Sequence, residues 1–382
     1  MTTAMSCSEG REESGSAVPR AGDFSTPVFR PIVLLRKPGQ GAGLLLEERV
    51  LIDARDVAHA LWEEIRNAMV EIDRPASLAL CCLLAAGHLL VEDVPGVGKT
   101  TLAKVIARAI GGHDSRIQCT EDLTAAGVIG QEIESTNPSL RPDEFIPGPL
   151  FANAVVLDEF NRATPRMQSG LLEAMEEHAV TVGKRRHALP RPFFCIGTMN
   201  PHDNSGTFEM AHASCDRFAM RTGIGYPSEV GERDLLMRFG GGEKRQESDP
   251  IVAPGDVVQL QKVIALLPCS EPVRAYLVRL LRSTREHPDV LVGASPRALL
   301  SMYRCTQAAA LLDNAAEVAV KHVRSLFEPC IAHRIRVRPE GSARAVCEEI
   351  LERTPVPVTT PPPTIAATEG LPKPGAPVRL AA

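Results

Sequence analysis

The chain has 382 residues, enough for about two folded units, and 44% of them are hydrophobic against 23% charged. This balance excludes a globally disordered protein, and the length excludes a single small domain. The formal net charge of -5 gives no general attraction to nucleic acid or to an anionic membrane. Because the apolar runs are too short for a bilayer and residues 1–20 lack an apolar signal segment, we expect a cytoplasmic protein without membrane insertion.

The two ends of the chain differ in composition from its middle. Residues 1–48 are rich in glycine, serine and charged side chains and show little periodicity. Eight prolines fall among the 29 residues from Thr354 onward. These compositions predict a disordered leader over 1–48 and a proline-rich disordered tail over 354–382.

From residue 49, short apolar runs alternate with amphipathic stretches. This alternation predicts an α/β core over 49–227, with a parallel five-stranded sheet covered by helices on both faces. The expected strands are 88–91, 116–120, 154–158, 193–198 and 220–226. The expected helices are 61–70 and 76–86, and, with the clearest pattern, 100–110 and 165–178.

After residue 227 the strand-like runs stop. Helix start signals follow, in which a serine N-cap precedes proline in the first turn, at Ser270 and again at Ser295. We therefore expect a smaller all-helical domain over 228–353.

A glycine-rich loop joins the first expected strand to the helix that follows it. Successive backbone N–H groups and a helix N-terminus hold a polyphosphate well. Lys99 is expected at the β and γ phosphates, the Thr100 hydroxyl at Mg²⁺, and Thr101 near the α phosphate. A glycine turn that only caps the helix is the alternative. The expected nucleotide-binding residues are Val94, Pro95, Gly96, Val97, Gly98, Lys99, Thr100 and Thr101.

The first position of this loop departs from the usual pattern. Phosphate loops of the form Gly-x-x-x-x-Gly-Lys-Ser/Thr have glycine where this chain has Asp93. Aspartate tolerates turn conformations, so we expect its carboxylate to point away from the phosphates, which it would otherwise repel.

Two carboxylates end the apolar strand 154–158. Asp158 would hold the Mg²⁺ shell, and Glu159 would orient and polarise the attacking water. Asn200 ends the next strand and would help to position that water. The alternatives are a solvated acidic turn and an asparagine that initiates a turn before proline.

Arginines near a γ phosphate stabilise the charge of the transition state in phosphoryl transfer. Arg217, before the fifth strand, and Arg297, at a helix start in the second domain, are candidates for this role. Arg162 and Arg166, beside the acid pair, are further candidates. For any single arginine, a surface ion pair is the commoner role.

These residues together resemble the MoxR family of AAA+ ATPases. The resemblance covers roughly residues 55–357. Its strings are the loop segment 87–101, Gly-Pro-Leu-Phe-Ala-Asn at 148–153, Asp-Glu-Phe-Asn-Arg-Ala at 158–163, Leu-Leu-Glu-Ala-Met-Glu at 171–176, Gly-Ala-Ser-Pro-Arg-Ala at 293–298, and the segments 333–336 and 350–357.

The resemblance implies an AAA+ P-loop core with Walker A at 93–100, Walker B at 154–159 and sensor 1 at Asn200. It implies an arginine finger at Arg217 that acts on a neighbour's nucleotide, and a sensor 2 at Arg297 that acts in cis. ATP and Mg²⁺ are the implied cofactors. The assembly would be a ring, usually a hexamer.

The resemblance also implies chaperone-like remodelling of a protein client and a possible partner with a von Willebrand factor A domain. The segment 128–151 resembles the family's insert in the second helix of the core, and 180–189 its hairpin before sensor 1. Two segments depart from the family: 70–72, where members usually carry Val-Gly-Gln near the adenine, and 208–214, before the finger.

The leading hypothesis is an Mg²⁺-dependent ATPase whose ring remodels a protein client. A nucleotide-gated assembly scaffold with little hydrolysis is the first alternative. A nucleic-acid motor is less favoured: three cations at 184–186 lie at an expected hairpin tip, but the net charge of -5 argues against binding to a polyanion. The ten cysteines form no Cys-x-x-Cys pair, so reduced core thiols are expected rather than a cysteine or histidine metal site.

Overall fold

The computed structural model describes residues 48–94, 96–133, 144–200, 208, 210, 212–241 and 249–358. The predicted leader up to residue 47, most of the predicted tail and Pro95 lie outside the described residues. Among the described residues, every helix is too short or too polar to span a bilayer.

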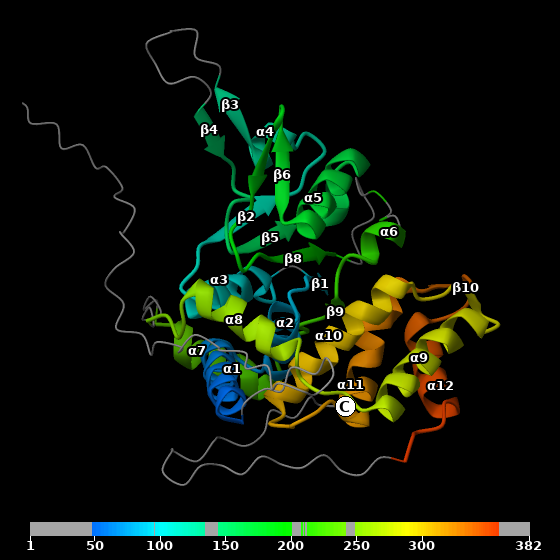
Figure 1. Ribbon diagram of the computed structural model, residues 1–382. Helices are drawn as coiled ribbons and strands as arrows, with labels where there is room; N and C mark the ends of the chain where they lie inside the picture. The colour runs from blue at the N-terminus through cyan, green and yellow to red at the C-terminus, as the bar shows by residue number, and fades with distance from the viewer. Residues whose placement is uncertain are drawn as a thin grey trace, which may run out of the picture.

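A five-stranded sheet forms the centre of the core, and all of its neighbouring strands run parallel. The order across the sheet is β2-β5-β8-β1-β9, so the strand before the glycine-rich loop lies between two others (Figure 1). The predicted parallel sheet is confirmed. Its strands are β1 (Leu89–Glu92), β2 (Asp114–Gln118), β5 (Ala154–Asp158), β8 (Phe194–Met199) and β9 (Met220–Thr222).

The fifth strand is shorter than the predicted 220–226. β9 ends at Thr222, because the backbone amides of Ile224 and Gly225 donate to the side chain of Asp93 instead of continuing the ladder with β1. Gly225 has a φ of 80°, which turns the chain away from the sheet.

Helices cover both faces of the sheet. α2 (Asp73–Leu84) and α3 (Lys99–Ala109) lie on one face with α1 (Glu48–Ala68), and α5 (Pro165–Glu177) lies on the other (Figure 1). Side chains alternate accordingly along β1: Leu89 and Val91 join the apolar cluster on the α2–α3 side, and Leu90 joins the cluster on the α5 side.

Two antiparallel hairpins project from the core on the α5 side (Figure 1). β3 (Gly130–Ile133) and β4 (Glu144–Pro147) follow α4 (Ala125–Ile129), within the expected insert at 128–151. β6 (Ala179–Val182) and β7 (Arg185–Ala188) form a hairpin where one was expected over 180–189. His187 stacks on Phe145 with ring centroids 3.8 Å apart, so the two hairpins pack on each other.

A helical lid follows the sheet, as predicted. Ser295 is the N-cap of the lid helix α10 (Pro296–Leu312), and its Oγ accepts from the Ala298 N–H at 3.0 Å. The lid helices are α7 (Glu229–Phe239), α8 (Pro254–Ile264), α9 (Glu271–Glu286), α10 (Pro296–Leu312), α11 (Val320–Ile331) and α12 (Ala343–Arg353), with the short η2 (Ala332–Arg334). The core has two further short elements, η1 (Phe160–Arg162) and α6 (His212–Cys215).

The lid also contains a two-stranded sheet that the sequence did not predict. β10 (Val290–Val292) pairs antiparallel with β11 (Arg336–Val337). These strands have three and two residues, too few for an alternating pattern to be recognised.

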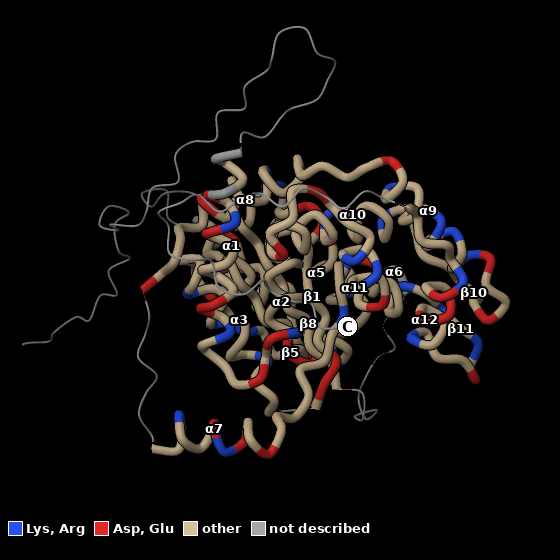
Figure 2. Tube along the Cα trace, turned by 90° about the horizontal axis from the view of Figure 1, so that it is seen from below, with Lys and Arg blue, Asp and Glu red and all other residues tan. Residues whose placement is uncertain are grey.

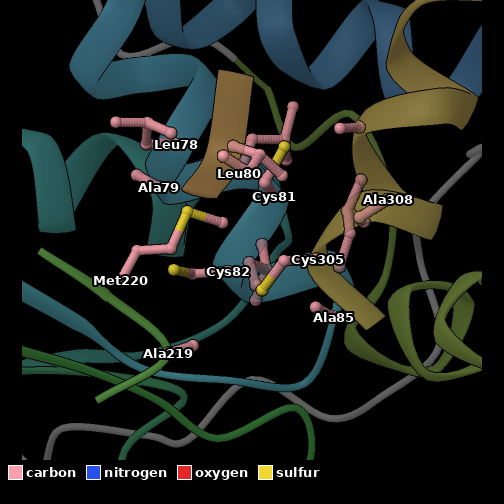
Figure 3. Packing of buried hydrophobic residues seen from close by; sticks show 14 of the residues in the cluster. Leu78, Ala79, Leu80, Cys81, Cys82, Ala85, Ala219, Met220, Cys305 and Ala308 are labelled. Carbon is pink, nitrogen blue, oxygen red and sulfur yellow. The ribbon is translucent and has the colours of Figure 1, made fainter. Parts of the chain in front are cut away.

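The lid and the core share one apolar cluster. Helix α2 of the core packs against α10 of the lid, and Cys82 and Cys305 face each other there among small side chains such as Ala85 and Ala308 (Figure 3). On the outer surface, acidic and basic residues are interspersed over α9 and α12 (Figure 2). The shared cluster therefore anchors the lid to the sheet domain through an apolar interface.

Candidate functional site

The glycine-rich loop leaves β1 at Glu92 and enters α3 at Lys99. Gly96 and Gly98 have φ angles of 86° and 96°, a region that other residues rarely adopt. A Cβ on Gly98 would lie 2.8 Å from Cε of Met69. The two glycines thus allow the loop to turn tightly into the N-terminus of α3, whose first amides have no partner within the helix.

Lys99 lies between the loop and the acid pair. Its Nζ donates to the backbone oxygen of Asp93 at 2.7 Å. Partial burial lowers the pKa of Lys99, and the negative charges of Asp158, Asp93 and Glu159 oppose that shift. The structure therefore brings the predicted phosphate-binding lysine and the two predicted carboxylates into one electrostatic cluster.

Asp158, at the end of β5, is held by groups from both neighbouring strands. Thr198 of β8 donates its Oγ1 proton to Oδ1 at 2.6 Å, and Arg116 of β2 donates to Oδ2 through Nε at 3.0 Å. Desolvation raises the pKa of Asp158, but the hydrogen bonds from Thr198 and Arg116 and the charges of Arg116 and Lys99 outweigh it and lower the pKa. The Asp158 carboxylate is therefore ionised at neutral pH.

Glu159 has an unusual backbone conformation for its residue type. Its φ and ψ of 54° and 49° are left-handed, and its N–H donates to Thr198 Oγ1 at 3.0 Å. Its Oε2 accepts from Gln118 Nε2 at 3.1 Å and lies 3.2 Å from Arg162 Nε. The side chain is thereby directed to the ends of β2 and β5, next to Asp158.

Three other predicted site residues, Asn200, Thr100 and Arg166, lie in or next to elements of the core that are described above. Asn200 directly follows β8, two residues after Thr198, and is half-buried. Thr100 is the second residue of α3. Arg166 is exposed in the first turn of α5.

A cavity of about 540 Å³ lies beside the loop. It is wide enough for a nucleoside, and its walls are largely apolar. Gly96, Val97, Gly98 and Thr101 form one side, residues 68–72 a second, and Ile224, Gly225, Tyr226, Pro227, Leu235 and Phe239 the rest.

The residues fit a magnesium nucleotide. Nothing lies within 4 Å of a Cβ built on Gly96, so the loop backbone there is open to a ligand. The Thr100 hydroxyl and the Asp158 carboxylate are oxygen donors of the kind that Mg²⁺ prefers alongside phosphates and water. Among the described residues no cluster of three His, Cys, Asp or Glu side chains forms a metal cage, and a magnesium site of this kind does not require one.

The carboxylate of Asp93 is directed toward backbone amides, in line with the expectation that it avoids the phosphates. Oδ1 accepts from the Val94 N–H at 2.7 Å, and Oδ2 accepts from the Ile224 and Gly225 N–H groups, both at 2.6 Å.

The two candidate arginines lie together and away from the loop of their own chain. Arg297 Nη2 is 2.6 Å from Glu176 Oε1, and Arg217 Nε is 3.3 Å from Glu176 Oε2. These three side chains line a cavity of about 250 Å³ that also includes Gly87 and His88. Those two residues precede β1, whereas the phosphate loop follows it, so about 13 Å of strand separates the arginines from the loop.

Several residues of the site were not predicted from the sequence. Thr198, Arg116 and Gln118 contact the acid pair, and Glu176 joins the two arginines.

Two further unpredicted residues lie beside the arginines. Asp216, next to Arg217, accepts from Ser295 Oγ at 2.8 Å. The buried Arg334 donates to the Phe218 oxygen at 2.7 Å and lies near Asp216. Arg334 belongs to the string 333–336 of the family resemblance, but its packing partners are remote in the chain.

Comparisons with known proteins agree with this geometry. Residues 88–220 match the ATPase family associated with various cellular activities (AAA), and residues 282–354 match the AAA lid domain. A solved structure from Cytophaga hutchinsonii, described as a candidate ATPase, aligns with a TM-score of 0.75 at 28% identity, covering 81% of this chain and 98% of that one.

Two curated relatives match over most of the chain. The uncharacterized protein YeaC of Bacillus subtilis is 37% identical over 301 residues, 78% of this chain and 93% of the relative. Chaperone MoxR1 of Mycobacterium tuberculosis is 32% identical over 323 residues, 82% of this chain and 83% of the relative. Since this relative is 32% identical over more than four fifths of both chains, and the AAA and AAA lid models also match, this chain belongs to the MoxR family of AAA+ ATPases.

Proposed function

We propose that the protein binds and hydrolyses ATP with Mg²⁺ at the interfaces of a ring of identical chains. One observation supports this most directly: the Lys99 ammonium lies in the same electrostatic cluster as Asp158 and Glu159, beside a cavity large enough for a nucleoside. Lys99 would bind the β and γ phosphates, Thr100 and Asp158 would hold Mg²⁺, and Glu159 would accept a proton from the attacking water, with Asn200 helping to position it.

The position of the arginines supports sites between subunits. Arg217 and Arg297 share one carboxylate at the end of the sheet opposite to their own phosphate loop. We propose that both act on the nucleotide of a neighbouring chain, which revises the sequence-based expectation that Arg297 acts in cis.

Helix α7 supports self-association. Within α7 only Gly231 is buried, whereas Val230, Leu236 and Met237 are 71%, 72% and 84% exposed. Figure 2 shows this helix at the margin of the molecule. Burying such side chains against a second copy would be favourable.

We further propose that hydrolysis drives chaperone-like remodelling of a protein client. The relative from Mycobacterium tuberculosis is named a chaperone, and the β3–β4 and β6–β7 hairpins project from the core, where they are accessible to a client. The predicted hexamer and the von Willebrand factor A domain partner remain expectations from the family resemblance.

The test is the substitution Glu159→Gln, assayed for nucleotide binding by calorimetry and for phosphate release. We expect magnesium nucleotide to bind as in the wild type and hydrolysis to fall by about 10² or more. Turnover near the wild-type rate in the variant would show that Glu159 is not the base. Tight binding without phosphate release by the wild-type protein would instead favour the assembly scaffold.

A further inference from the structure

Asp93 connects the phosphate loop to a segment far away in the sequence. Its Oδ2 accepts two hydrogen bonds of 2.6 Å from the backbone of Ile224 and Gly225, which follow β9. Its Oδ1 accepts from Val94 within the loop, and its own N–H donates to Met199 of β8 at 3.0 Å. Hydrogen bonds from amides to an ionised carboxylate are among the stronger ones in proteins.

A second carboxylate, from the cavity wall formed by residues 68–72, binds the same segment. Glu71 accepts from the Ser228 N–H at 2.7 Å through Oε2 and from the Ser228 hydroxyl at 2.6 Å through Oε1. The side-chain hydrogen bond from Ser228, with its backbone N–H, lowers the pKa of Glu71. Glu71 has a φ of 50°, which is costly for a residue other than glycine and is kept only where surrounding contacts hold the backbone.

The segment 223–228, held by both carboxylates, has two roles in the architecture. It joins β9 of the sheet to α7, the first lid helix. Its Ile224, Gly225, Tyr226 and Pro227 also form one wall of the cavity beside the phosphate loop. The segment therefore connects α7 mechanically to a wall of the cavity beside the phosphate loop.

The charge of Asp93 makes this arrangement sensitive to phosphate. With the segment docked, three backbone amides compensate the carboxylate. If the segment leaves, only the Val94 amide of those three remains, and the under-compensated negative charge lies at the first position of a loop that receives a polyanion. Like charges at close range repel, so polyphosphate affinity falls when the segment undocks.

We propose that Asp93 and Glu71 are positioning residues that make docking of segment 223–228 and occupancy of the phosphate loop mutually dependent. This inference rests on the proposed nucleotide site and adds its regulation. Because coupling between two events is reciprocal, a bound triphosphate also favours the docked segment and so fixes the start of α7. The exposed apolar face of α7 would then be oriented by the nucleotide state.

A double-mutant cycle tests the proposal in the full-length chain. The magnesium complex of a non-hydrolysable ATP analogue is titrated by calorimetry into the wild type, Glu71→Gln, Asp93→Asn and the double variant. Glu71→Gln weakens the hydrogen bonds that hold Ser228 at the end of the segment. The dissociation constant of the analogue should therefore rise about fivefold or more in the wild-type background. In the Asp93→Asn background residue 93 has no charge that could repel the phosphates. Glu71→Gln should therefore change the dissociation constant there by less than about twofold.

Additive effects would overturn the proposal, because a direct contact between Glu71 and the nucleotide persists whether residue 93 is charged or neutral. Asp93→Gly, the usual residue of phosphate loops, provides a second background if Asp93→Asn folds poorly. Glu92→Gln is the matched control: this neighbouring carboxylate pairs with Arg221 of β9 at 2.9 Å and does not bind the segment, so it should combine additively with Glu71→Gln.

The outcome is separable from that of the proposed function. A non-additive cycle in a protein that releases no phosphate would keep the coupling and remove the ATPase assignment. An additive cycle in an active ATPase would remove the coupling alone. Failure of every variant and of the wild type to bind the analogue would overturn both.

Discussion

Arg217 of the core and Arg297 of the lid are bound to the two oxygens of a single carboxylate, that of Glu176 at the end of α5. The side chains of all three are 29% to 44% exposed, so solvent screens both ion pairs and weakens them. A phosphate from a neighbouring chain would offer each guanidinium a stronger, charge-assisted partner.

The first prediction concerns complementation between subunits. Arg217→Ala and Arg297→Ala should each lower hydrolysis, Arg217→Ala by about 10³ or more, because an arginine finger contributes 10³ to 10⁵ in rate. Mixing either variant with Glu159→Gln should restore part of the activity, since one chain then supplies the base and its neighbour the arginine. The measurement is phosphate release by the mixed protein.

The control for this mixing experiment is the double variant Arg217→Ala/Glu159→Gln, which should restore nothing to Arg217→Ala. If Arg297 served the nucleotide of its own chain, the mixture with Arg297→Ala would show only the average of its two components. That result would return Arg297 to the cis role expected from the sequence.

The second prediction concerns Thr198, which bridges the acid pair. Its hydroxyl donates to Asp158 and accepts from the Glu159 N–H, and the residue is 1% exposed. Thr198→Val leaves that N–H without this acceptor in the interior, so urea unfolding should show a loss of about 1 to 3 kcal/mol. Hydrolysis should also fall, because the two carboxylates lose their common support.

A threonine elsewhere provides the comparison for Thr198. Thr284 is also buried, and its hydroxyl donates to Leu281 and accepts from Ala294 within the lid. Thr284→Val should cost similar stability while leaving hydrolysis at saturating nucleotide unchanged. Equal effects of the two variants on hydrolysis per folded molecule would contradict a specific role for Thr198.

The sequence was sufficient to predict the parts of the site that are local in the chain. Lys99 and Thr100 follow a strand and begin a helix within one continuous pattern, and Asp158 and Glu159 end an apolar run that is buried on both faces. A parallel sheet then places the carboxyl ends of its strands along one edge, which is why these groups meet.

The sequence was not sufficient for contacts that depend on register or on lid placement. Gln118 lies opposite Asp158 only because β2 and β5 pair in one particular register across 40 residues of chain. Arg297 meets Glu176 because the apolar interface between α2 and α10 fixes where the lid sits. Neither contact leaves a periodic signal in the chain, so the pattern of residues alone does not say where Arg297 lies. Its expected cis role came from the family resemblance.

The third prediction concerns the magnesium requirement. Arg116 donates to the same oxygen of Asp158 from β2 through two of its nitrogens, so its positive charge competes with a metal ion there. Arg116→Gln should lower the Mg²⁺ concentration for half-maximal hydrolysis by a few fold, in keeping with about 0.5 to 1 kcal/mol for a partly exposed pair. Asp158→Asn should raise it, and a requirement unchanged by both substitutions would argue against Asp158 as a metal ligand.

The last prediction concerns stability against pH. His88 is buried before β1, where its Nε2 donates to the Met175 oxygen at 3.2 Å and its Nδ1 accepts from the Cys195 N–H at 3.1 Å. Burial lowers the pKa of His88 from 6.5 to about 4. Between pH 6.5 and 4 the unfolded chain therefore binds a proton that the folded chain does not, so stability increases with pH through this window.

From pH 7 to pH 5 the wild type should lose about 2 kcal/mol of its free energy of unfolding through His88, measured by urea unfolding. Burial also lowers the pKa of His333 well below its usual value, which adds a loss of the same sign. The His88→Gln variant keeps a donor and an acceptor without a titrating ring, and its stability should fall by about 2 kcal/mol less than the wild type over that interval. Equal pH dependence in the two proteins would show that His88 is not held neutral in the folded chain.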